Sequence, residues 1–76
     1  MVQRMKYQLV ASSRSRATEI YRGEDGSLVQ VEHYRSGVTD AWPVESIPES
    51  LTVRYSDGEV WETDPIMESV TFPAQA

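Results

Sequence analysis

Cysteine is absent from the 76 residues, and histidine and phenylalanine occur once each. Without cysteine, no disulfide and no thiolate zinc site can stabilise the fold, so apolar packing must hold it together. With His33 as its single histidine, the chain cannot build a metal site from a cluster of imidazoles. No apolar run approaches the roughly 20 residues of a membrane helix, and the first residues lack the apolar stretch of a secretory signal. We therefore expect a cytoplasmic protein with no membrane partner.

Large apolar side chains are also scarce, because Leu, Ile, Val and Phe together number 16. That fraction lies just above the level at which disorder becomes the default, so we expect a folded chain with a small core. The length leaves room for one small domain, 1–76, with a frayed tail at 73–76. A homodimer or an obligate partner would add buried surface to so small a core.

Apolar and polar residues alternate along 5–11, 29–32 and 51–55. This period of two is the pattern of half-buried strands. Nine valines and four tyrosines against three leucines favour strands over helices as well. The sequence therefore predicts a mainly β fold, a small antiparallel meander of five to seven short strands that closes into a barrel or a sandwich.

Glycine marks three reversals between these strands, at 23–26, 36–37 and 56–58. We expect a hairpin at each, with glycine supplying the positive φ of a tight turn. Two proline-containing segments do not fit strands: near 43–49 we expect a crossover or at most one helical turn, and near 64–69 at most one helical turn.

Charge is distributed unevenly along a chain with a net charge of −5. Residues 1–22 hold five of the seven basic side chains, and residues 23–76 hold eleven of the twelve acidic ones. Cross-strand pairing between a basic first hairpin and acidic neighbours would explain this layout without any function. The alternative is an electrostatic surface field directed at a partner.

A set of carboxylates falls in or beside the two Asp-Gly segments: Glu24, Asp25, Asp57, Glu59, Glu62 and Asp64. If both segments project from the same end of the fold, these side chains form an anionic patch. Such a patch attracts a basic protein surface, including grooves that normally hold nucleic acid, and speeds association with it.

The two tryptophans differ in their expected surroundings. We expect Trp42 in the core. Trp61 shares a strand face with Glu59 and Thr63, so either it fills the core or it is an exposed anchor that enters a pocket and stacks on arginine.

A polar loop at 11–17 carries Arg14 and Arg16, which could contact phosphates, with Tyr7 or Tyr21 stacking on bases. Binding driven by phosphates usually enlists more cations than these two. A solvated connecting loop is therefore the favoured interpretation, and nucleic acid is the less favoured partner.

Catalytic motifs are missing. The chain carries no glycine-rich phosphate loop, no zinc-protease motif and no EF-hand spacing. His33 follows Val29 and Val31 on one strand face, where a partly buried structural role is expected. Glu59 and Glu62 fall on opposite faces of a strand and cannot share a substrate. We expect no enzymatic activity, no cofactor and no metal.

These observations favour a non-catalytic protein-binding module, an inhibitor or decoy whose acidic hairpin end occupies a basic surface of a partner. In size and charge the chain is similar to the anti-defence proteins of mobile elements, anti-CRISPR proteins included, and this comparison transfers no residues. Two alternatives stay open: a small nucleic-acid-binding β-barrel that uses Arg14 and Arg16, and a structural subunit of a larger assembly.

Overall fold

The computed structural model describes residues 5–63 and contains six strands. They are β1 (Met5–Ser12), β2 (Thr18–Gly23), β3 (Leu28–His33), β4 (Thr39–Val44), β5 (Val53–Arg54) and β6 (Val60–Thr63). All pairings are antiparallel, in the order β4-β3-β2-β1-β5, and β6 also pairs with β1. The prediction of a mainly β antiparallel meander is confirmed.

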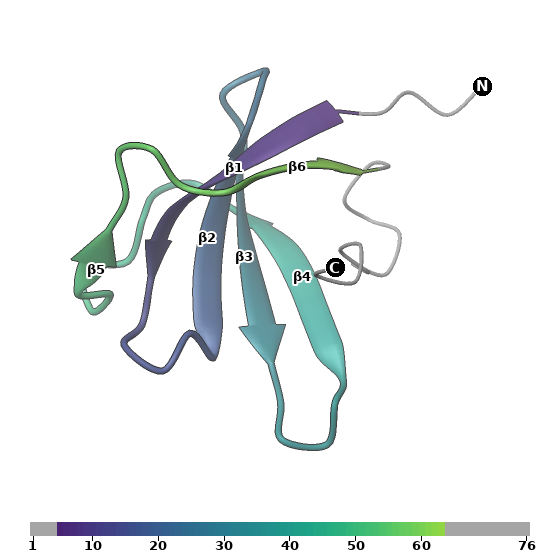
Figure 1. Cartoon of the computed structure of the whole chain (residues 1–76), viewed down its shortest axis with the longest axis vertical. Coiled ribbons are helices and arrows are strands. Elements are labelled where there is room, and N and C mark those ends of the chain that lie inside the picture. Colours follow the sequence, from purple (N-terminus) through teal and green to yellow (C-terminus); the bar gives the residue numbers. More distant parts are fainter. Residues whose placement is uncertain (1–4, 64–76) are drawn as a thin grey trace.

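The sheet is open rather than closed into a barrel, so the barrel alternative is wrong. Within the described part of the chain, β4 pairs only with β3, and no ladder joins β4 to β5 or β6. Figure 1 shows β1 and β6 running obliquely across the upper ends of β2, β3 and β4, as a strongly twisted small sheet does. This arrangement agrees with the sandwich-like form of the prediction.

The two faces of the sheet carry separate core clusters, and a β-bulge in β1 decides the face on which Ala11 lies. Leu9 pairs with Tyr21 and Ala11 pairs with Ile20, so Val10 is an extra residue in the ladder. One cluster lies on the face of Tyr21, and we call this the Tyr21 face: its buried members are Tyr7, Leu9, Tyr21, Val29 and Val31. The opposite face, the Ile20 face, carries Val10, Ala11, Ile20 and Leu51. The bulge moves Ala11 to this second face, which strict alternation did not predict.

Two of the expected hairpins are confirmed, β2–β3 and β3–β4. In the first, the N–H of Gly26 donates to the carbonyl of Gly23 at 3.0 Å, and in the second, the N–H of Gly37 donates to that of Tyr34 at 2.9 Å. Gly26 has φ +88° and Gly37 has φ +93°. Glycine reaches this left-handed conformation without the steric cost that a Cβ brings.

The third expected hairpin, at 56–58, is wrong. β5 and β6 do not pair with each other, because both lie along the same edge of β1. The segment between them is fixed at its two ends, where the N–H of Tyr55 donates to Val10 and the N–H of Leu9 donates to Glu59, each at 2.9 Å. Gly58 is needed here for a close approach rather than for a positive φ, since a Cβ at this position would overlap the carbonyl oxygen of Leu9.

Of the two alternatives for 43–49, the crossover is confirmed and the helical turn is wrong. Pro43 and Val44 belong to β4, and a sheet tolerates proline in such an edge strand. Residues 45–52 contain no helix and return toward β5, with Ile47 and Leu51 packed on the cluster of the Ile20 face. The expected turn at 64–69 and the frayed tail at 73–76 lie outside the described residues. Residues 5–63 include no helix that could span a membrane.

Candidate protein-binding surfaces

The one acidic residue of the basic N-terminal region, Glu19, is 4% exposed and is the centre of a polar network. Its Oε2 accepts from Nε of Arg16 at 3.0 Å and from Nη2 at 2.7 Å. Its Oε1 accepts from the Tyr21 hydroxyl at 3.3 Å and lies 2.6 Å from Nε2 of His33. Sequence reasoning missed this network, because no local signal indicates that a glutamate between Thr18 and Ile20 is buried.

Arg16 joins this network to the far edge of the sheet. It has φ +65°, an uncommon conformation for a residue with a side chain. Its Nη2 pairs with Oε1 of Glu59 at 3.0 Å as well as with Glu19. The two carboxylates, Glu59 foremost, raise the pKa of the Arg16 guanidinium above its ordinary value. Burial, together with the Glu19 carboxylate, raises the pKa of the Tyr21 phenol.

These contacts bear on the phosphate-binding alternative. Arg16 already holds two carboxylates, so its guanidinium is not available to bridge phosphates without breaking them. Arg14 is exposed in the same turn and makes no ion pair with the described carboxylates. The structure therefore leaves one of the two predicted arginines open to a ligand.

His33 lies on the face of Val29 and Val31, as the alternation predicted. One ring nitrogen contacts Glu19, and the other lies 3.5 Å from the Thr39 hydroxyl, at the outer limit of a hydrogen bond. The imidazole thus joins β2 to β4 on this face. Over residues 5–63 no group of three potential metal ligands comes together.

Three of the six predicted carboxylates gather around the start of β1. Oε2 of Glu24 accepts from the backbone N–H of Lys6 at 2.9 Å, and Glu62 is the cross-strand neighbour of Lys6. Asp25 follows Glu24 in the turn and accepts from the N–H and the hydroxyl of Ser27, at 2.9 and 2.6 Å. These two hydrogen bonds lower the pKa of Asp25. We call Glu24, Asp25 and Glu62 the β1 acidic group.

The other three predicted carboxylates are not part of this group. Glu59 is held by Arg16. Asp57 is exposed in the segment between β5 and β6. Asp64 lies outside the described residues. The basic N-terminal hairpin therefore does pair with one of the acidic residues that the sequence assigned to the patch.

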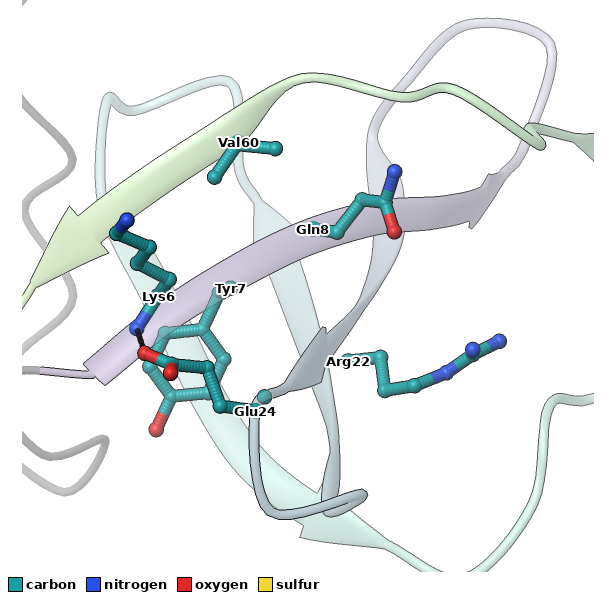
Figure 2. A pocket seen from close by; sticks show the side chains of 7 residues that line it. Lys6, Tyr7, Gln8, Arg22, Glu24 and Val60 are labelled. Atoms are coloured by element: carbon teal, nitrogen blue, oxygen red, sulfur yellow. Dashed lines mark hydrogen bonds between the residues drawn. The ribbon is translucent and has the colours of Figure 1, made fainter.

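A shallow cavity of about 170 Å³ lies beside the β1 acidic group. Its lining includes Lys6, Gln8, Arg22, Glu24 and Val60 (Figure 2). Figure 2 shows Arg22 and Glu24 pointing away from one another. Neither cation makes an ion pair with a described carboxylate. Lys6 and Arg22 thus reduce the negative potential of this end without neutralising any one acid.

Of the two tryptophans, Trp61 was expected either in the core or as an exposed anchor, and Trp42 was expected in the core. Trp61 is half-buried and packs against the cluster of the Tyr21 face. Trp42 belongs to neither cluster and is 38% exposed, so the prediction that it lies in the core is wrong. After β4 the chain brings Ile47 and Leu51 to the cluster of the Ile20 face, and Trp42 is not among the residues that pack there.

Most carboxylates of the described chain face solvent. Apart from Glu19 and Glu59, none forms an ion pair with a described cation. Seven of these other carboxylates belong to exposed residues: Glu24, Asp25, Asp40, Glu45, Glu49, Asp57 and Glu62. No family model, curated protein or solved structure matches the chain. Its function must therefore be argued from these surfaces.

Proposed function

We propose that this chain is a non-catalytic protein-binding module, an inhibitor or decoy that engages a basic surface of a partner protein. The supporting observation is the exposure of the β1 acidic group, whose three carboxylates surround the start of β1 and form no ion pair with a described cation. In this mechanism they take the positions of phosphates on a surface that normally holds nucleic acid. Asp57 is the further carboxylate open to such a contact.

The geometry also defines how the group would act. Asp25 is fixed by its own turn and Glu24 by the Lys6 amide, so two carboxylates are held in place before a partner arrives. Side chains ordered in advance lose less entropy on binding. Glu59 is excluded from this interface, because leaving Arg16 would break the contact to the buried network.

Charge reversal tests the proposal. The partner is captured from the native host with the wild-type chain, and its association rate is measured by surface plasmon resonance over a range of salt concentrations. We expect binding to weaken steeply with salt and Glu24→Lys with Glu62→Lys to slow association at least tenfold, since steering by opposite charges acts mainly on the association rate. Glu45→Lys with Glu49→Lys is the matched control.

Two results would contradict the proposal. One is binding that does not change with salt. The other is an equal loss from both pairs of reversals, because a field spread over the whole surface would not require the β1 acidic group.

A structural subunit of a larger assembly is the second candidate. The observation that favours it is the small core, in which nine apolar residues of the described chain are buried. Light scattering over a range of protein concentrations tests this alternative, and a constant monomer mass would reject self-assembly.

A further inference from the structure

Trp42 lies outside both core clusters and is one of the exposed large hydrophobic side chains of the described residues. It is a cross-strand neighbour of Gln30 on the Ile20 face of β4 and is 38% exposed. Leu28 and Val44, the next pair along the same two strands, are half-buried against the cluster of this face. An exposed tryptophan that continues an apolar strip is the kind of side chain that supplies binding energy at protein interfaces.

The pair on the other side of Trp42 consists of two carboxylates. Glu32 and Asp40 are directly opposite one another in the β3–β4 ladder. Like charges in this arrangement destabilise a sheet. Both oxygens of Glu32 accept from the Thr18 hydroxyl, at 3.0 and 2.8 Å, which holds the carboxylate over the strands without neutralising it. No described cation pairs with either acid.

The spacing fits one chemical group. Asp40 and Trp42 are two residues apart on one face of β4, about 7 Å along the strand. A planar cation placed between the two side chains can hydrogen-bond to the Asp40 carboxylate through its edge and stack its flat face on the Trp42 indole. Arginine has this shape, since its guanidinium forms forked hydrogen bonds to carboxylates and stacks on aromatic rings, whereas lysine is a point charge.

We propose that Trp42, Glu32 and Asp40 form a docking surface for an arginine side chain of a partner protein. An arginine side chain complements this surface in charge and shape, because its guanidinium relieves the repulsion between the two acids and covers the exposed indole. This surface lies on β3 and β4 and shares no residue with the β1 acidic group. It therefore stands or fails independently of the function proposed above.

The test uses the wild-type chain and a short blocked peptide with two arginines separated by glycine, with the lysine counterpart as comparison. NMR spectra report the indole N–H signals of both tryptophans, assigned with Trp42→Phe. We expect saturable shifts of the Trp42 signal and of the Glu32 and Asp40 amides, with affinity at least twofold higher for the arginine peptide.

Carboxylate variants identify the contact. Glu32→Gln and Asp40→Asn should each weaken arginine-peptide binding about twofold to fivefold, as expected for an exposed charge pair. Asp40→Asn should at the same time raise the urea midpoint, because it removes like-charge repulsion from the sheet. Glu45→Gln with Glu49→Gln is the matched control and should leave the affinity unchanged.

Three outcomes would overturn this inference: a Trp42 signal unmoved at millimolar peptide, equal affinity for both peptides, or equal losses from the control and the Glu32 and Asp40 variants. A Trp42 shift that persists in Glu24→Gln with Glu62→Gln would separate this surface from the β1 acidic group. Loss of the shift in that variant would assign the binding to the general negative field and overturn the proposal.

Discussion

Replacing Glu19 with glutamine should destabilise the fold more than any substitution of an exposed acid. The Glu19 side chain is 5% exposed. Its carboxylate accepts charge-assisted hydrogen bonds from Arg16 and lies close to the His33 ring. Such bonds contribute about 1.5–3 kcal/mol each. Both partners are themselves 45% and 38% exposed, so solvent screens part of the gain. We expect Glu19→Gln to cost about 2–3 kcal/mol in the free energy of unfolding.

Glu59→Gln is the matched control, because it removes a carboxylate from the same guanidinium at a position where the side chain is 53% exposed. An exposed pair of this kind contributes about 0.2–1 kcal/mol. Urea unfolding at pH 7, followed by circular dichroism, measures both. With a slope of about 1 kcal/mol/M, the midpoint should fall by about 2–3 M for Glu19→Gln and by less than about 1 M for Glu59→Gln. Equal losses of stability in the two variants would show that burial does not strengthen the interactions of Glu19.

The remaining predictions concern single contacts. Gly58→Ala should lower the free energy of unfolding by about 3 kcal/mol or more, since the added Cβ overlaps the Leu9 carbonyl. Gly26→Ala has open space around its Cβ and should lower it by about 1 kcal/mol, because of its φ of +88°. Thermal melts measure both. The pKa of Tyr21 is raised on folding. Above pH about 10 the phenol therefore ionises in the unfolded chain first, which lowers the free energy of unfolding of the wild type by about 1.4 kcal/mol at pH 11. Tyr21→Phe should lack this loss between pH about 7 and pH about 11 in urea titrations. The pKa of Asp25 is lowered in the folded chain. Its contribution to stability is therefore full above the unfolded-state pKa and is lost as the pH falls through the lower folded-state pKa. Asp25→Ala should be less stable than the wild type at pH 7, and the difference should shrink in acid.

Much of the fold followed from local patterns. Alternation identified the strands, and the Gly26 and Gly37 turns were found because a left-handed residue after a tight turn favours glycine. The same logic failed at Gly58, where glycine is selected by contact with a strand distant in sequence. Local patterns fix which residues are extended, and they do not fix which edges pair.

The candidate surfaces were predicted less completely for the same reason. Glu24, Asp25 and Glu62 are exposed, but the composition around the Asp-Gly segments could not indicate that Arg16 holds Glu59. The exposure of Trp42 depends on where residues 45–52 cross the sheet. Such a path is set by packing between distant segments, and no period in the sequence records it.

The position of β1 between β2 on one side and β5 and β6 on the other has a consequence for biosynthesis. While only the strands before β5 have been synthesised, the outer edge of β1 has no backbone hydrogen bonds, because its partners lie 41 to 58 residues later in the sequence. Pairings across so long an intervening chain form slowly, and bare strand edges attract other nascent chains. Until β5 and β6 have paired with it, this edge is the part of the sheet most open to pairing with another chain, so refolding at a higher protein concentration should increase aggregation.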